Sequence, residues 1–154
     1  MSKKGKIILA VLVFGFLLGS PLAAQEWTKS SLQNLYMDYL RIEGYTPSLT
    51  SNGDVLFKIA GENYVIEVSN DDLQYFSVYY GLNLRNVTYT DALYAANYAS
   101  MRSKVAKLWI DTSDGLTVWV EVQILLNNPR DFSTHFSRIV SILRNAISNF
   151  ESQI

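Results

Sequence analysis

The alternation of apolar and polar residues in two pairs of adjacent segments constrains the fold more than any other sequence feature. Successive side chains of a strand point to opposite faces, so apolar residues at every second position define a buried face. In the first pair we expect Ile59 opposite Tyr64, with Gly61 and Glu62 at the centre of a type II′ turn. The shared face of this hairpin would contain Val55, Phe57, Ile59, Tyr64, Ile66 and Val68.

The second pair predicts a hairpin with a three-residue loop at Ser113, Asp114 and Gly115. The apolar residues of the two strands can share one face only if the loop contains an odd number of residues. A bulged loop of this kind needs a residue in the left-handed conformation, here Gly115. Trp109 and Trp119 would then lie directly opposite each other on the outer face. The inner face would contain Leu108, Ile110, Leu116, Val118, Val120 and Val122.

A further strand is expected at residues 73–81, between the hairpins. Its buried face stays open at this point, because two alternating sets are both apolar enough to be buried. One set is Phe76, Val78 and Tyr80, and the other is Tyr75 and Tyr79.

Three segments have the periodicity of amphipathic helices. In the first, Ser30 and Gln33 are expected to form a capping box, and Gly44 is expected to end the helix. Its apolar face would contain Leu32, Leu35, Tyr36, Tyr39 and Leu40. A middle helix is predicted at residues 91–105, and its small residues Ala92, Ala95, Ala96 and Ala99 would permit close packing.

The last helix carries the clearest signals of a helix start. Asn128 is a suitable cap, Pro129 fits the first turn, and Asp131 faces the positive end of the helix dipole. The apolar stripe that follows contains Phe132, Phe136, Ile139, Val140, Leu143, Ile147 and Phe150.

The predicted order of elements is α-β-β-β-α-β-β-α. Strands joined by hairpins pair in antiparallel fashion, and helices that pack on one face give an α+β domain. We therefore predict a five-stranded, largely antiparallel sheet with three helices. The chain of 154 residues suits one domain, which we place at residues 25–154.

The first 24 residues have the layout of a secretory signal peptide. Lys3, Lys4 and Lys6 precede an apolar run at residues 7–19, and Ala24 suits cleavage before Gln25. The run is shorter than the ~20 residues that a membrane-spanning helix needs. We expect a bacterial periplasmic or secreted protein, and an uncleaved membrane anchor is the alternative.

Charge and composition exclude several classes of function. The formal net charge is −1, and removal of residues 1–24 with their three lysines leaves about −4. Such a chain lacks the basic surface that nucleic-acid binding requires, so no nucleic-acid partner is expected. The chain has no cysteine and one histidine, which excludes disulfides, zinc–thiolate sites and sites with two imidazoles. No cofactor is expected.

Several segments together resemble the YbjN-type domain, a family often described as bacterial sensory transduction regulators. The resemblance lies in the Gly-Tyr-Thr-Pro sequence at residues 44–47, residues 52–58, residues 75–82, and residues 92–98 with Asn97 in an alanine-rich helix. The last hairpin and the long C-terminal helix complete it. The resemblance implies a fold similar to that of type III secretion chaperones, and a non-enzymatic binding module that forms dimers.

The candidate catalytic groups are better explained by structure than by chemistry. Ser133 and His135 are two residues apart on a helix and therefore point in different directions, so they cannot act as nucleophile and base. Asp111 and Asp114 flank a predicted turn, where aspartate is common. They and the adjacent pair at residues 71–72 lack the spacing of a calcium loop. We therefore predict no catalytic or metal-binding residues.

The aromatic residues are the best candidates for a binding surface. Two tryptophans on the outer face of a sheet imply either an intramolecular cover or a contact surface. Six tyrosines between residues 75 and 98 either pack between a strand and the middle helix or line a groove. The partner-binding residues we predict are Trp109, Trp119, Tyr75, Tyr79 and Tyr80.

The sequence thus predicts an exported, non-enzymatic module, chaperone-like or regulatory, that recognises a protein or peptide through its sheet face. A homodimer is expected, and contact with a membrane only if the signal segment stays attached. The alternative is a carrier of a small apolar or aromatic ligand between sheet and helices.

Overall fold

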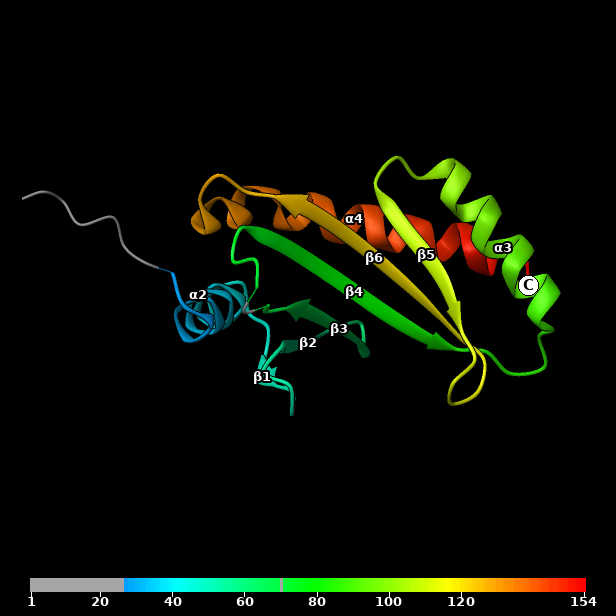
Figure 1. Ribbon diagram of the computed structural model, residues 1–154, viewed down its shortest axis with the longest axis horizontal. Coiled ribbons are helices and arrows are strands. Elements are labelled where there is room, and N and C mark those ends of the chain that lie inside the picture. Colours follow the sequence, from blue (N-terminus) through cyan, green and yellow to red (C-terminus); the bar gives the residue numbers. More distant parts are fainter. Residues whose placement is uncertain (1–26, 70) are drawn as a thin grey trace, which may run out of the picture.

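The computed structural model describes residues 27–69 and 71–154, so the predicted signal peptide lies outside the described residues. Figure 1 shows the arrangement of the elements. In chain order they are α2 (Lys29–Ile42), β1 (Ser48–Leu49), β2 (Val55–Ile59), β3 (Glu62–Glu67), β4 (Tyr75–Asn83), α3 (Tyr89–Arg102), β5 (Ala106–Asp111), β6 (Thr117–Leu125), the 3-10 helix η1 (Pro129–Asp131) and α4 (Phe132–Glu151).

The strands form one sheet in the order β1-β2-β3-β4-β6-β5, and every neighbouring pair is antiparallel. The predicted α+β class is confirmed, but the sheet has six strands where five were predicted. The additional strand, β1, consists of Ser48 and Leu49, which are both exposed and pair with β2. Two exposed residues carry no alternation, so the sequence pattern does not reveal them.

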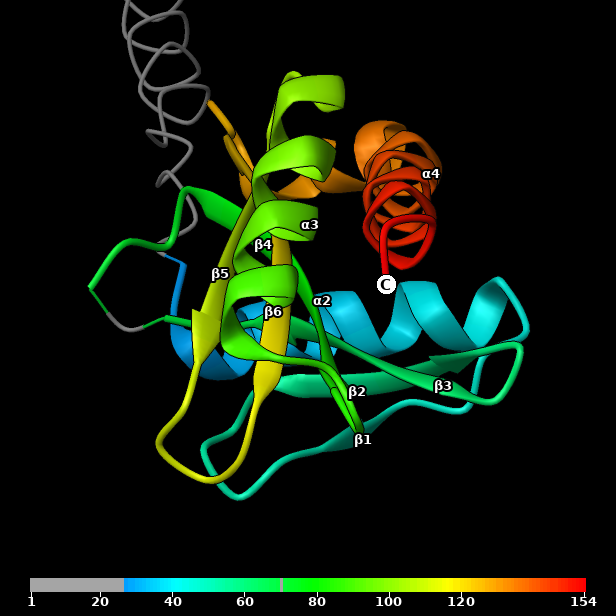
Figure 2. The ribbon, with the colours of Figure 1, turned by 90° about the vertical axis from the view of Figure 1, so that its right-hand side faces the viewer.

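The long helices cover one face of the sheet, and Figure 2 shows α2 and α4 on the same side of the strands. Aromatic side chains join these layers. Tyr36 of α2 lies 5.4 Å from Phe76 of β4 and 4.8 Å from Phe132 of α4, measured between ring centroids. The α4 stripe is buried as predicted, and the four predicted alanines of α3 are buried as well. Among the described residues, no helix is both long and apolar enough to cross a membrane.

The β5–β6 hairpin has the predicted register. Trp109 pairs with Trp119, and Gly115 has a φ of 88° in the loop. A φ of this sign favours glycine, so turn chemistry and apolar parity select the same register.

The β2–β3 hairpin differs from the prediction by two residues. Ile59 pairs with Glu62, and Tyr64 lies opposite Phe57. The loop is Ala60 and Gly61, with φ values of 52° and 91°, so both residues adopt the left-handed conformation that a type I′ turn needs. The predicted type II′ turn at Gly61 and Glu62 was wrong. A shift of two residues keeps each side chain on its face, so the alternation itself is preserved.

Strand β4 begins and ends two residues later than predicted, and its buried face is now defined. Phe76, Val78 and Tyr80 are buried on the side of the helices. The alternate residues, which include Tyr75 and Tyr79, lie on the outer face.

The helix ends follow local capping rules, although three boundaries were misplaced. Thr28, and not Ser30, caps α2: its Oγ1 accepts a hydrogen bond from the Ser31 amide at 3.1 Å, and the Ser31 hydroxyl accepts one from the Thr28 amide at 2.8 Å. Gly44 ends this helix as predicted, with a φ of 86°. Thr88 caps α3 at its start, and the helix runs from Tyr89 to Arg102, so it begins two residues and ends three residues before the predicted bounds of 91 and 105.

Asn128 does act as a cap, but of η1. Its side chain accepts a hydrogen bond from the Arg130 amide at 3.0 Å. Pro129 and Asp131 fall within this 3-10 turn, and the α-helix itself begins at Phe132.

Leu143 lies in the buried stripe of α4 and His135 lies at the exposed flank of that stripe, so the two should respond differently to truncation. Leu143 is fully buried, so Leu143→Ala should lower the free energy of unfolding by about 2–4 kcal/mol through the cavity it leaves. His135 is exposed, so His135→Ala should change the free energy of unfolding by less than ~1 kcal/mol. Denaturant unfolding of both variants measures the contrast, and equal losses would contradict the placement of the α4 stripe.

Candidate functional site

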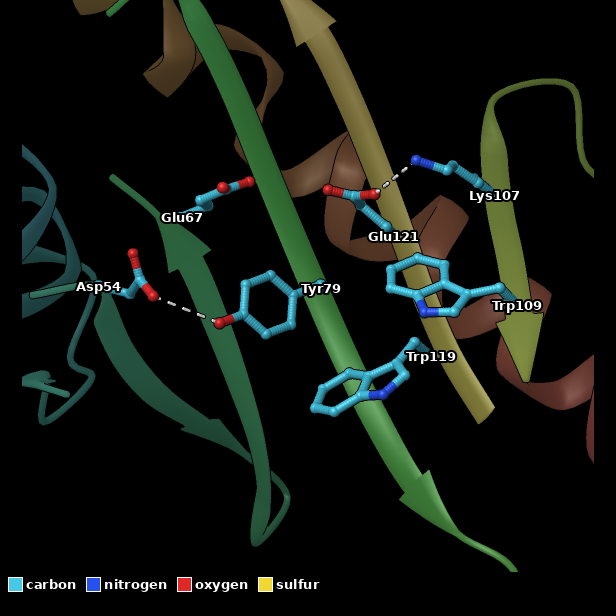
Figure 3. A pocket seen from close by; sticks show the side chains of 7 residues that line it. All are labelled: Asp54, Glu67, Tyr79, Lys107, Trp109, Trp119 and Glu121. Atoms are coloured by element: carbon cyan, nitrogen blue, oxygen red, sulfur yellow. Dashed lines mark hydrogen bonds and ion pairs between the residues drawn. The ribbon is translucent and has the colours of Figure 1, made fainter. Parts of the chain in front are cut away.

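The outer face of the sheet, which α2, α3 and α4 do not cover, contains an open pocket of about 400 Å³. Figure 3 shows its lining side chains, which come from the residue before β2 and from strands β3, β4, β6 and β5. We call it the outer-face pocket. Its lining residues are Asp54, Glu67, Tyr79, Lys107, Trp109, Trp119 and Glu121.

Three aromatic side chains form one continuous part of this pocket. The rings of Trp109 and Trp119 are stacked, with centroids 6.4 Å apart and planes 21° from parallel. Tyr79 meets Trp119 edge-on at 5.7 Å. Gly81 lies opposite Trp119 in the β4–β6 ladder, and a Cβ at position 81 would lie 2.6 Å from Cζ3 of that indole. The glycine therefore provides the space in which Trp119 lies across β4.

Glu121 is the most buried charged group of the pocket, with a residue exposure of 5%. Its Oε1 accepts hydrogen bonds from the Ser77 hydroxyl at 2.6 Å and from Nε2 of Gln123 at 2.7 Å. Its Oε2 lies 3.5 Å from Nζ of Lys107. A buried carboxylate is costly unless it is hydrogen-bonded, and these neighbours supply the required donors.

Lys107 contacts both an acid and an aromatic ring of the pocket. Its ammonium group lies 5.4 Å from the Trp109 ring centroid, within the range of a cation–π interaction, and it also forms the long ion pair with Glu121. The Lys107 side chain remains 65% exposed. It therefore lies over the rim and leaves the pocket open.

Asp54 and Tyr79 define the opposite side of the pocket. Oδ1 of Asp54 accepts a hydrogen bond from the Val68 amide at 2.9 Å, which fixes the carboxylate, and Oδ2 lies 3.5 Å from the Tyr79 hydroxyl. Burial, together with the Asp54 and Glu67 carboxylates, raises the pKa of Tyr79 to about 12. Tyr79 therefore stays neutral at physiological pH and serves as a hydrogen-bond donor.

Glu67 completes the acidic groups of the pocket. Partial burial raises its pKa above the usual value, and the neighbouring Glu121 and Asp54 carboxylates raise it further. Lys107 and Lys29 act in the opposite direction. The pocket thus holds three carboxyl groups, which together attract positively charged groups.

The structure brings together three of the five predicted binding residues: Trp109, Trp119 and Tyr79. Tyr75 is exposed on the outer face at the far end of β4 and does not line the pocket. Tyr80 lies on the helix-facing side, where it is buried and its hydroxyl donates to Oε2 of Glu62 at 3.1 Å. The predicted set therefore combines residues from both faces of β4, which do not form one surface.

The tyrosines between residues 75 and 98 do not form one groove. Tyr89 and Tyr94 are exposed on α3, and α3 packs against α4 and β5. Tyr79 and Tyr80 point to opposite faces of β4. The six tyrosines therefore neither line one groove nor pack together in one layer between β4 and α3.

The charged residues that line the pocket were not among the predicted binding residues, although the predicted β5–β6 register indicated two of them. Glu121 shares the parity of Trp119 within β6, and the predicted register pairs it with Lys107. Asp54 and Glu67 reach the pocket only through the pairing of β3 with β4, in which Glu67 lies opposite Ser77. Alternation within either hairpin contains no information about that pairing.

The other titratable candidates have local roles. Oδ1 of Asp111 accepts a hydrogen bond from the Ser113 amide at 2.8 Å, and the hydrogen bonds from Ser113 lower the pKa of Asp111. Oδ1 of Asp72 accepts one from the Gln74 amide at 3.0 Å. Within residues 27–69 and 71–154, no three His, Cys, Asp or Glu side chains are arranged to hold a metal ion.

The fold has a counterpart among solved structures. No family model matches the sequence, and no curated protein matches it. The chain is similar to YbjN from E. coli, described as "a putative transcription regulator", with a TM-score of 0.61 and 9% identity over 77% of this chain and 89% of that chain. The chain therefore has a YbjN-like fold, as its sequence resemblance predicted. At this identity the likeness concerns the fold alone.

The raised pKa of Glu67 predicts how its replacement changes stability with pH. The folded state binds the Glu67 proton more tightly than the unfolded state, so stability falls as pH rises from the unfolded pKa through the folded one. Glu67→Gln removes this loss, so the variant should gain stability relative to wild type between pH 4 and pH 7. Glu43→Gln, at the exposed end of α2, controls for the loss of one negative charge. Thermal unfolding at both pH values is the measurement, and a pH-independent difference would contradict the account.

Proposed function

We propose that the protein is a non-enzymatic binding module that recognises a protein or peptide partner through the outer face of its sheet. The observation that carries this proposal is the Trp109–Trp119 pair on a face that α2, α3 and α4 leave uncovered. The outer face of an antiparallel sheet is normally polar, and tryptophan is enriched at the centres of protein interfaces. YbjN, which shares the fold, is described as a putative transcription regulator, and a regulatory role is part of the proposal.

Export to the periplasm or secretion is part of the proposal. Its support is the sequence of residues 1–24, with a basic start, an apolar run and a small residue at position 24. An exported module would meet its partner outside the cytoplasm. A second copy of the chain is one candidate partner, because the resemblance to YbjN-type domains implies dimers.

A carrier of a small aromatic ligand is the second candidate function. The outer-face pocket supports it, since about 400 Å³ falls within the size range of small-molecule sites. This pocket lies on the outer side of the sheet, however, and not between sheet and helices where the sequence placed it. Its carboxyl groups also disfavour a purely apolar ligand.

Replacement of both tryptophans tests the proposed surface. Trp109→Thr with Trp119→Thr keeps strand propensity, so the domain should stay folded while partner affinity falls by roughly tenfold or more. Tyr94→Ala, which removes an exposed aromatic residue from α3, should leave affinity unchanged. Pull-down from the native host's periplasm with quantitative mass spectrometry, beside thermal unfolding, measures both effects. A folded double variant that captures the same proteins equally well would refute the proposal.

The N-terminus of the protein isolated from its native host tests export. Cleavage after Ala24 should give a chain that begins at Gln25, or at its cyclised form pyroglutamate. N-terminal analysis by mass spectrometry measures this directly. A membrane-bound protein with residues 1–24 intact would show an anchor instead.

A further inference from the structure

The outer-face pocket combines ring surfaces with an excess of negative charge. Three carboxyl side chains, Asp54, Glu67 and Glu121, line it against one cationic side chain, Lys107. Trp109 and Trp119 contribute indole rings, whose faces carry the negative end of the ring quadrupole. The indole rings and the carboxyl groups therefore favour the same kind of ligand, one with positive charge and some apolar surface.

Lys107 is an example of a cationic group in contact with this surface. Its ammonium lies over the Trp109 ring at 5.4 Å and beside Oε2 of Glu121 at 3.5 Å. The ion pair is longer than the 2.7–2.9 Å of a strong charge-assisted hydrogen bond, and the side chain is largely exposed. A second cation can therefore approach Oε2 more closely while Lys107 moves toward solvent.

Glu121 is held in place before any ligand arrives. Ser77 and Gln123 fix its Oε1 with hydrogen bonds of 2.6 and 2.7 Å, which leaves Oε2 directed toward Lys107 and the pocket. A carboxylate already ordered and partly desolvated loses little freedom on binding a cation, and its attraction is stronger than at an exposed site.

We propose that the outer-face pocket receives a lysine or arginine side chain from a basic segment of a peptide or protein partner. This assignment rests on the proposed function and specifies the chemistry of the partner. The alkyl part of the side chain packs on Trp109 and Trp119, and its cationic head lies between Glu121 and Glu67. The remaining carboxyl, Asp54, attracts neighbouring positive charge on the same segment.

The same charges disfavour other occupants. A second copy related by a two-fold axis would place this acidic patch against itself, which opposes like charges. Asp54, Glu67 and Glu121 do not gather closely enough, among the described residues, to form a metal-ion site. A basic partner is the occupant that matches both the charge and the apolar surface.

Binding of defined peptides tests the proposal. The probes are a short fluorescent peptide of alternating lysine and glycine, its arginine counterpart, and a peptide of the same length with glutamate in place of the cations. The two basic peptides should bind in low salt, bind more weakly in high salt, and bind at least about tenfold more tightly than the acidic peptide. Equal binding of the acidic peptide would overturn the proposal.

Matched variants locate the binding. Glu67→Gln should weaken the basic peptides by about fivefold or more, whereas Glu43→Gln removes one charge elsewhere and should change binding by less than about twofold. Trp109→Thr provides a second variant that changes no charge and should also weaken binding. Equal effects of Glu67→Gln and Glu43→Gln would show general attraction to an acidic protein and would overturn the proposal.

Two further measurements separate this proposal from its alternatives. Choline chloride is titrated in competition, and displacement of the peptide at similar concentrations would indicate a small organic cation as the occupant. Sedimentation of wild type and of the double tryptophan variant tests self-association, and a dimer that this variant dissociates would identify a second copy. Either result overturns the basic-segment assignment. If the basic peptides fail to bind while the double variant still loses its partner, the cation assignment fails and the proposed function stands.

Discussion

The antiparallel register of β4, β6 and β5 is the constraint on which the rest of the structure depends. One alignment places Val118, Val120 and Val122 against the helices and Trp119 and Glu121 on the other face. A slip of one residue would bury the carboxylate of Glu121 in the core and expose the valines, so core stability and pocket geometry are fixed by the same pairing. Gly81 adds a local requirement, because it is the β4 position that accommodates the Trp119 ring.

The sequence predicts this region well because two independent rules coincide there. Apolar parity and the need for a left-handed Gly115 both select the pairing of Trp109 with Trp119. In the β2–β3 hairpin parity leaves two registers equivalent, and the observed turn uses a left-handed Ala60, which residue preference does not favour. The two-residue strand β1 and the helix cap at Thr28 depend on a few local contacts that periodicity does not report.

The candidate site was predictable in its aromatic part and less so in its charges. Trp109 and Trp119 follow from one hairpin, and Lys107 and Glu121 follow from the same register. Tyr75 and Tyr80 show the limit, since a strand with two apolar faces does not reveal which face is covered. Asp54 and Glu67 enter through the β3–β4 pairing, which is set by tertiary packing. A fold shared with YbjN at 9% identity also leaves the chemistry of this face to the chain's own residues.

The indole N–H resonances of the three tryptophans test the central claim most directly, because Trp27 provides an internal reference. Trp27 lies outside the outer-face pocket, with the Arg130 guanidinium over its ring at 5.6 Å. Titration of the lysine peptide into ¹⁵N-labelled protein should shift the Trp109 and Trp119 resonances in a saturable manner and leave that of Trp27 in place. A shift confined to Trp27, or no shift of any indole at saturating peptide, would contradict the assignment of the outer face as the binding surface.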